Sequence, residues 1–401
     1  MGWLGLDDTD SLEEGCTTFT FHLLLQGLPA SATVRIPRLV RLWPFAHQRT
    51  RGNAALGVEI ETQNEQELID YLNEFWMEHI LVNKGKISQS SHDGRKQYPA
   101  DPGMVWFSNR QPSESYYFAA VRGEIQLGMV PQADYSWGSQ GRIGATAAVA
   151  WKLDATCTWE AIAWREYERH GHLQRSVCQL TLEVIDNFPT TFLSRDPRKG
   201  RALVAPRGPC PVLFGVRCRD QSGALKAGEL LQNAEQTESS IGMRVFATNQ
   251  ATDDHIPNSM NATVEYVEIF GRGACRIQTD NGDWMAFAES GSLKILAQWL
   301  RAGDRIEGYG LSPEKGVIHL EKLRLVSAVP EKVRPKCPEC GARMKSMGAE
   351  QGCRCPKCKF KSEDRWDEIL RKPPFTSWVQ PPHDSRRHLA RPLEWDNLHL
   401  D

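Results

Sequence analysis

The chain has 401 residues, 40% of them hydrophobic, and a formal net charge of -2, so it is long enough for two to four domains with cores of their own. It contains neither an apolar run long enough to cross a membrane nor the charged-then-apolar start of a signal peptide. These features disfavour membrane and secreted classes, and the sequence predicts a soluble, cytoplasmic protein. Eleven cysteines, an odd number, are expected to be reduced thiols rather than disulfides.

The first part of the chain is predicted to mix strands and helices. Residues 3–6 indicate a short strand, and the apolar run 19–25 indicates a helix. Residues 65–82 place apolar side chains at helical spacing. The glycine-rich turn GSQGRIG at 138–144 precedes the small residues 145–150, which are typical of a helix start.

The middle and later parts of the chain differ in their patterns of apolar and polar residues. Residues 180–185 and 211–217 suggest strands, and residues 158–169 and 223–234 suggest helices, so an α+β arrangement is expected. From residue 261 onward, short alternating segments are separated by turns. Five strands with a helix at 291–301 after the third give the outline of an OB barrel, and a small open barrel of another type would look similar.

Two C-x-x-C pairs predict a structural zinc site. They are CPEC at 337–340 and CPKC at 355–358. Four thiolates at this spacing close a tetrahedral site with no open position. The predicted ligands are Cys337, Cys340, Cys355 and Cys358. Cys353 is a nearby fifth thiol, expected to be a spectator. Basic residues around the site favour nucleic acid as the partner, and a protein-binding role is the alternative.

The stretch GLDDTDS at 5–11 places three carboxylates directly after the first strand. Carboxylates this close repel one another unless a cation lies among them. Asp7, Asp8 and Asp10 therefore predict bound Mg²⁺, with phosphate attached. The alternatives are a solvated Asx turn and an aspartyl-phosphate phosphatase with Asp8 as its nucleophile.

Two further features favour phosphate. Residues 15–58 contain no Asp or Glu, and guanidinium groups match phosphate oxygens. The arginines of this region are Arg35, Arg38, Arg41, Arg49 and Arg51. The glycine turn with Gly141, Arg142 and Gly144 offers backbone N–H groups that could cradle a phosphate.

The adjacent hydroxyls of Thr17 and Thr18 follow Cys16 closely after the acidic stretch. An acidic metal site could activate either hydroxyl as a phosphoryl acceptor. The alternative is that they only cap a helix.

Taken in order, the motifs resemble those of the archaeal agmatinylcytidine synthetases acting on isoleucine tRNA, the TiaS family. The motifs are GLDDTDS with GCTT, IPRLVRLWP with RTRGNAA, GRIGATAA, PCPVLFGVR, FATNQATDDH, the two C-x-x-C pairs and PPHDSRRHLARPL. They cover essentially the whole chain. The segment 83–101 looks idiosyncratic.

The resemblance implies four parts: a kinase-like ATP-binding catalytic domain at 1–135, a ferredoxin-like domain at 136–258, an OB-fold RNA-binding domain at 259–330, and a zinc ribbon with the C-terminal tail at 331–401. It implies an ATP-dependent ligase that attaches agmatine to the 2-carbonyl carbon of the wobble cytidine in a CAU anticodon, by way of a phosphorylated cytidine. No obligate protein partner is evident.

The resemblance also implies residue roles. Asp7, Asp8 and Asp10 would organise Mg²⁺-ATP, and the threonine pair would be the autophosphorylation site, with Thr17 the first choice and Thr18 the second. Agmatine carries a guanidinium that needs carboxylates or carbonyls. The candidates are Asp253, Asp254 and Gly215 of the PCPVLFGVR stretch. A non-catalytic RNA-binding protein is the alternative from another class.

Overall fold

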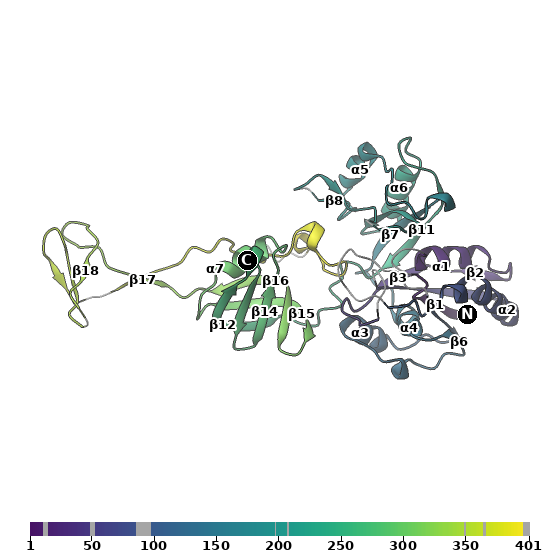
Figure 1. The fold of residues 1–401 in the computed structure, drawn as a ribbon, viewed down its shortest axis with the longest axis horizontal. Coiled ribbons are helices and arrows are strands. Elements are labelled where there is room, and N and C mark those ends of the chain that lie inside the picture. The colour runs from purple at the N-terminus through teal and green to yellow at the C-terminus, as the bar shows by residue number, and fades with distance from the viewer. Residues whose placement is uncertain are drawn as a thin grey trace. The chain divides into compact units, whose positions relative to one another are not determined.

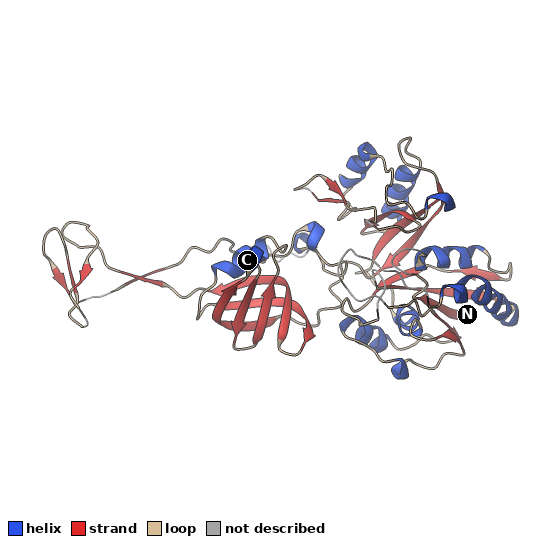
Figure 2. Cartoon of the chain, in the orientation of Figure 1, coloured by secondary structure: helices blue, strands red, loops and turns tan. Residues whose placement is uncertain are grey.

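The computed structural model describes residues 1–10, 15–48, 53–85, 98–196, 198–206, 208–348, 350–363 and 366–395. The chain forms two compact units, drawn in Figures 1 and 2. Unit 1 comprises Met1–Pro257 and Arg386–Pro392, and unit 2 comprises Asn258–Ser385 and Leu393–Asp401. The chain therefore leaves unit 1 after Pro257, returns to it for residues 386–392, and then leaves it again.

A nine-stranded sheet organises unit 1, in the order β10-β7-β11-β3-β4-β1-β5-β6, with β2 paired to β4. The strands are β1 (Gly2–Asp7), β2 (Ala32–Val34), β3 (Arg38–Arg41), β4 (Ala54–Thr62), β5 (Gly103–Ser108), β6 (Tyr135–Gly138), β7 (Thr158–Arg165), β10 (Val212–Cys218) and β11 (Ser240–Thr248). The parallel pairing of β11 with β3 joins the early and late strands into one sheet. A short separate hairpin contains β8 (Arg195–Asp196) and β9 (Arg201–Ala202).

Helices cover both faces of the β1 region of this sheet (Figure 2). They are α1 (Thr17–Gln26), α2 (Glu65–Phe75), α3 (Glu114–Arg122) and α4 (Arg142–Ala150), while α5 (Gln179–Asp186) and α6 (Gln221–Gln232) belong to the β7–β10 part. Leu4 and Leu6 point to the face of α1 and α2, because side chains alternate along a strand. On the other face, a Cβ at Gly5 would overlap the Ala145 carbonyl, so only glycine allows α4 to pack this closely on β1.

Several predicted elements are confirmed, including the strand at 3–6, the helices at 19–25 and 223–234, and the strand at 211–217. The predicted helix at 158–169 is wrong, because residues 158–165 form the strand β7, between β10 and β11, and residues 167–169 form only a 3-10 turn. All β7 side chains except that of Trp159 are buried, so the strand lacks the alternation of buried and exposed positions that would have identified it.

The predicted strand at 180–185 is also wrong, since it forms α5. Leu182 and Ile185 are buried three residues apart, whereas Leu180 and Val184 are exposed. That is the spacing of a helix face, which a short β-branched run had obscured.

Unit 2 contains a closed barrel in the order β12-β13-β14-β16-β15. Its strands are β12 (Met260–Ile269), β13 (Cys275–Thr279), β14 (Gly282–Ala286), β15 (Arg305–Glu314) and β16 (Val317–Ser327). The helix α7 (Ser292–Trp299) follows the third strand, as predicted. Trp284, Leu293 and Leu296 are fully buried in the barrel core.

Beyond the barrel lie short strands and loops. β17 (Glu331–Val333) pairs with β21 (Asp367–Ile369). A three-stranded sheet contains β18 (Lys345–Ser346), β19 (Cys353–Arg354) and β20 (Lys361–Ser362). Across the described part of the chain, no helix has the length and apolar character needed to span a bilayer.

Candidate active site

The three aspartates lie where β1 ends, in a turn held by their own carboxylates. Asp8 has a φ of 58°, a left-handed conformation that Asp tolerates better than most residues. Its N–H donates to Asp7 Oδ1 over 2.7 Å. The N–H of Asp101 donates to Asp8 Oδ2 over 2.9 Å, which brings a fourth carboxylate to the turn from a segment 93 residues later in the sequence.

The glycine turn before α4 packs against this acidic turn. Gly141 donates its N–H to the Asp101 carbonyl over 2.9 Å. A Cβ at Gly144 would overlap Asp7 Oδ2, so the glycine lets that carboxylate lie against the first turn of α4. The structure therefore brings together Asp7, predicted as a magnesium ligand, and Gly141 and Gly144, predicted to bind phosphate. Helix N-termini favour negative charge.

Burial raises the pKa of Asp7 to about 7, with Asp10 adding repulsion against the lowering effect of the Asp8 N–H. Burial also raises the pKa of Asp8 to about 8, and the charges of Asp7, Asp10 and Asp101 contribute. Burial, assisted by repulsion between neighbouring carboxylates, thus disfavours the charged forms of Asp7 and Asp8. Asp101 Oδ1 is buried with no hydrogen-bond partner among the described residues, and Lys84 Nζ lies 3.8 Å from it.

The two threonines have different partners at the start of α1. Thr17 Oγ1 donates to Asp10 Oδ1 over 3.1 Å and accepts from the Thr9 N–H over 3.3 Å. Thr18 Oγ1 instead accepts from Trp164 Nε1 over 3.1 Å and lies 3.0 Å from Cys16 Sγ. The Thr17 hydroxyl is therefore the one of the pair that is directed at the acidic turn.

A cavity of about 450 Å³ opens beside Asp7 and Asp8. Its size suits a small-molecule site. Gly141 and Gly144 line it on the side of α4, while the remaining walls include apolar side chains. Those apolar residues include Leu42, Trp43, Ile125 and Leu127. The cavity therefore combines carboxylates, a helix start and apolar walls, which is a combination that a nucleotide can use.

The predicted arginines are spread over three places. Arg38 lies at the far end of α4, where it donates to the carbonyls of Val149 and Trp151 and stacks 4.3 Å from the Trp3 ring. The structure does not bring Arg38 to the acidic turn. Arg142 begins α4 and donates to the Ser139 carbonyl over 3.3 Å.

Arg41 lies in an enclosed polar cluster instead. Burial lowers its pKa, Glu160 opposes this and Arg217 adds to it, while Cys16 also lies within electrostatic range. Arg49 and Arg51 lie outside the described residues.

The three predicted agmatine residues fall into two environments. Asp253 Oδ1 accepts from the Arg391 N–H over 2.7 Å. Asp254 Oδ2 accepts from Tyr117 Oη over 2.6 Å. Gly215 lies on β10 directly against the side chain of the buried Glu160.

Sequence reasoning missed Asp101, Glu160, Gln250 and His388 as parts of this region. Their local sequence gave no chemical pattern, because contacts across 90 or more residues join Asp101 to Asp8 and, separately, Glu160 to Gln250 and Gln250 to His388. The signal available was indirect. Gln250 and His388 stand within two motifs that carried the resemblance, FATNQATDDH and PPHDSRRHLARPL.

The predicted zinc ligands do converge in unit 2. The sulfur atoms of Cys337, Cys340, Cys355 and Cys358 all lie within 4.8 Å of one another. This arrangement fits a tetrahedral zinc site with four thiolate ligands. Cys353 stands outside the set, and its Sγ accepts from Arg334 Nη1 over 3.6 Å. Among the described residues, the aspartates of the β1 turn do not converge this tightly.

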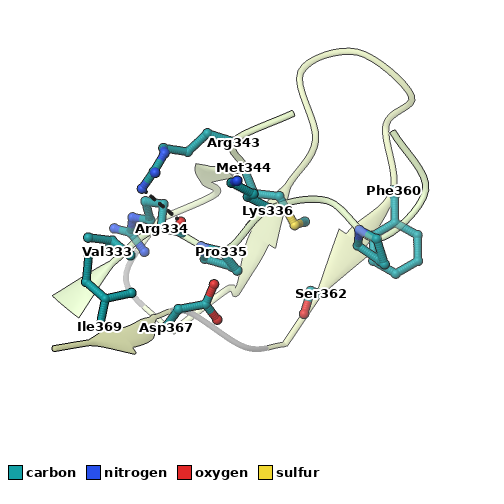
Figure 3. Close-up of a pocket in the computed structure, with 11 residues that line it drawn as sticks. Val333, Arg334, Pro335, Lys336, Arg343, Met344, Phe360, Ser362, Asp367 and Ile369 are labelled. Carbon is teal, nitrogen blue, oxygen red and sulfur yellow. Dashed lines mark hydrogen bonds between the residues drawn. The ribbon is translucent and has the colours of Figure 1, made fainter. Parts of the chain in front are cut away.

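A pocket of about 630 Å³ is lined by residues of the same region, between positions 333 and 369 (Figure 3). Apolar and basic side chains share its lining with Asp367. The apolar ones are Val333, Met344, Phe360 and Ile369, and the basic ones are Arg334, Lys336 and Arg343. The Arg334 guanidinium also stacks 3.8 Å from the Trp366 ring. Proteins that bind single-stranded nucleic acid commonly do so with basic groups beside aromatic rings.

These observations define a class: multidomain α/β proteins that combine a carboxylate-lined cavity, next to a turn that contacts the Thr17 hydroxyl, with a barrel and a four-cysteine ribbon. Three family models match the chain, described as the TiaS TCKD domain at residues 3–134, the TiaS FLD domain at 139–255 and the TiaS C-terminal zinc ribbon domain at 334–371. TiaS of Archaeoglobus fulgidus, a 2-agmatinylcytidine synthetase of isoleucine tRNA, is 30% identical, over 98% of this chain and 96% of that protein. The chain belongs to the TiaS family.

Solved structures agree with this assignment. The chain matches a complex of TiaS with isoleucine tRNA and ATP with a TM-score of 0.81 and 28% identity, over 99% of this chain and 97% of that one. It matches a complex of TiaS with isoleucine tRNA, AMPCPP and agmatine with a TM-score of 0.77 and 26% identity, over the same shares. The Pyrococcus horikoshii relative of the same name is 30% identical, over 97% of this chain and 96% of that protein.

Proposed function

We propose that this chain is an ATP-dependent ligase that attaches agmatine to the 2-carbonyl carbon of the wobble cytidine in isoleucine tRNA with a CAU anticodon, forming agmatidine. Full-length similarity to proteins named as 2-agmatinylcytidine synthetases of isoleucine tRNA supports this activity. Related structures hold isoleucine tRNA with ATP, or with an ATP analogue and agmatine. These relatives favour the ligase over a non-catalytic RNA-binding protein and over a phosphatase.

The chemistry explains why the site needs a phosphoryl-transfer centre. A pyrimidine carbonyl oxygen is a poor leaving group, and phosphorylation of that oxygen lets an amine displace it as phosphate. The protein's task is to place the nucleotide, the cytidine and the amine and to stabilise the charge that develops.

The acidic turn fits a magnesium ion by the chemistry of its donors. Asp7, Asp8 and Asp10 offer hard oxygen ligands, and Asp101 adds a buried oxygen without a hydrogen-bond partner in the described part of the chain. Mg²⁺ usually takes one or two carboxylates with waters and substrate phosphates, so it does not need a closed protein cage. When bound, it would neutralise charge on the phosphates.

Thr17 is the proposed phosphoryl acceptor, and one observation carries this choice. Its hydroxyl donates to Asp10 Oδ1 over 3.1 Å, so this carboxylate can take the proton as the oxygen attacks a phosphorus atom of ATP and the rest of the nucleotide leaves. The Thr18 hydroxyl is engaged by Trp164 and Cys16 instead. Thr18 is therefore proposed to hold the start of α1 in place.

Some of the other ATP and agmatine contacts predicted from the sequence remain part of the proposal. Gly141, Gly144 and Arg142 at the start of α4 are proposed to face the triphosphate, together with Arg41, and Arg49 and Arg51 remain predictions from sequence. Asp253 already accepts a hydrogen bond from the Arg391 N–H, and Asp254 accepts one from Tyr117 Oη. We therefore retain Gly215 as the proposed agmatine contact.

The parts of the chain are proposed to follow the family's organisation. The closed five-stranded barrel with α7 after its third strand supports an OB fold at 259–330. The kinase-like domain at 1–135 and the ferredoxin-like domain at 136–258 share one sheet in unit 1. The pocket with basic residues between positions 333 and 369 suits tRNA, and a tRNA-modifying enzyme is expected in the cytoplasm.

Substitution of each threonine tests the assignment. We expect Thr17→Val to lower agmatidine formation at least about 100-fold, because the nucleophile is lost, and Thr17→Ser to retain a measurable rate. Thr18→Val should keep most of the activity. Phosphopeptide mapping after incubation with ATP should find phosphate on residue 17, and full activity of Thr17→Val would contradict the assignment.

A further inference from the structure

Residues 386–392 form a fixed part of unit 1. The His388 carbonyl accepts from the Ala251 N–H over 2.9 Å, and the Leu389 carbonyl accepts from the Asp253 N–H over 2.9 Å. The Leu389 side chain is buried in the same apolar cluster as Tyr117. Arg387 stacks 4.7 Å from the ring of Phe45. Segment 386–392 is thus anchored by its backbone and by side chains on both sides of His388.

His388 begins a line of hydrogen bonds that runs into the sheet. Its Nδ1 lies 3.1 Å from Gln250 Oε1. Gln250 is fully buried, and its Nε2 donates to Glu160 Oε2 over 2.6 Å. Because the amide nitrogen is engaged with the carboxylate, the amide oxygen is the acceptor, and His388 Nδ1 must carry the proton. The neutral imidazole suits this role, and the pKa of His388 is lowered well below its ordinary value by Arg41, by burial and by Arg217.

Glu160 links this line to the two arginines. Its Oε1 lies 3.6 Å from Arg217 Nε, and its charge also opposes the lowering of the Arg41 pKa. Glu160 is 4% exposed, so a change in its orientation would leave a buried charge without its partners. Two guanidinium groups against one carboxylate leave positive charge in this cluster, and Arg41 is within electrostatic range of Cys16, next to Thr17.

We infer that His388 is a positioning residue for the reaction: through Gln250 it holds Glu160, and through Glu160 it orients Arg217 and Arg41, of which Arg41 interacts electrostatically with Cys16 at the start of α1. The inference rests on the proposed function, because it assigns these cations to the phosphoryl group handled at Thr17. The C-terminal motif RRHLARP is then part of the catalytic unit, delivered after the chain has passed through unit 2. Hydrogen-bond partners that orient a reactive group often change activity by about 10- to 100-fold when removed.

The test compares two substitutions at one position. His388→Ala removes the donor, whereas His388→Asn places an amide N–H at a similar distance from the backbone. We expect His388→Ala to lower kcat for agmatidine formation by about 10- to 100-fold with the KM for ATP nearly unchanged, and His388→Asn to recover most of the loss. His79→Ala, at an exposed histidine in the turn that follows α2, is the matched control and should be unaffected.

Each outcome decides the matter. Full kcat in His388→Ala would overturn the inference, and so would equal losses in His388→Ala and His388→Asn with unchanged melting temperatures, since the donor would then be irrelevant. Wild-type protein assayed in parallel separates the two claims. If wild type forms no modified cytidine, the proposed function fails on its own, and ATP cleavage by the variants still measures the effect of His388.

Discussion

The charged form of Asp7, which the proposed magnesium site needs, destabilises the folded protein. Its pKa is raised to about 7 and that of Asp8 to about 8, against 3.8 when exposed, so the folded protein holds these protons more tightly than the unfolded chain. The resulting stabilisation is complete below about pH 4 and is lost as the pH rises through 7 to 8. Charged carboxylates in this turn are therefore a cost that only a ligand can offset.

Asp7→Asn should remove that cost together with activity. We expect the variant to melt at a higher temperature than wild type at pH 8 without divalent metal, by an amount corresponding to about 1 kcal/mol or more, with the difference shrinking toward pH 5. Differential scanning calorimetry across this range measures it. Glu74→Gln, at an exposed carboxylate, is the control. A wild-type protein more stable than Asp7→Asn at pH 8 in the absence of metal would contradict the account.

Gly144 is the residue that makes room for Asp7. Gly144→Ala should push the carboxylate away from α4, destabilise the fold by about 2 kcal/mol and abolish the activity, because the added Cβ would overlap Asp7 Oδ2. Gly171→Ala is the control, since a Cβ there meets nothing within 4 Å. Thermal unfolding and product assays of the pair check the prediction, and a wild-type-like Gly144→Ala would show that Asp7 is not held where the structure has it.

At the scale of elements, the four-cysteine ribbon has little apolar core of its own. Its buried cluster consists of Cys337, Met344, Cys353 and Cys355, so metal bonds must supply most of its stability. Small units of this kind unfold when their metal is removed.

Two cysteine variants separate ligand from spectator. Cys340→Ser should lose the bound zinc and weaken tRNA binding, whereas Cys353→Ser should keep one zinc per chain, because Cys353 stands outside the converging sulfurs. Metal content by atomic emission and tRNA binding by filter retention measure both effects. Zinc loss in Cys353→Ser with retention in Cys340→Ser would reverse the ligand assignment.

The elements also show what local sequence can predict. The four-cysteine site, the closed barrel and the acidic turn after β1 were predictable from sequence. Each corresponds to a contiguous motif or to a regular alternation of apolar and polar residues. The strand β7 and the helix α5 were not, since burial on both faces of β7 removed its alternation and α5 shows only a short apolar face.

For the whole molecule, long-range contacts limited the prediction of the site. Asp101 joins the acidic turn from the segment before β5, and His388 joins unit 1 from the end of the chain. Neither has a local pattern that indicates its partners. Arg38 shows the converse, because its arginine-rich surroundings suggested phosphate, whereas tertiary structure places it at the carbonyl end of α4.

The chain passes between its two units three times, after Pro257, after Ser385 and after Pro392, because residues 386–392 return to unit 1 after the barrel and the ribbon. Unit 1 is therefore complete only when this segment is in place.

The most direct test of the central claim is mass spectrometry of the nucleosides of isoleucine tRNA with a CAU anticodon, after incubation with the purified protein, Mg²⁺-ATP and agmatine. The account predicts a wobble cytidine heavier by the mass of agmatine minus water, and no such product from Thr17→Val. An unmodified cytidine under conditions where the protein binds the tRNA would contradict it.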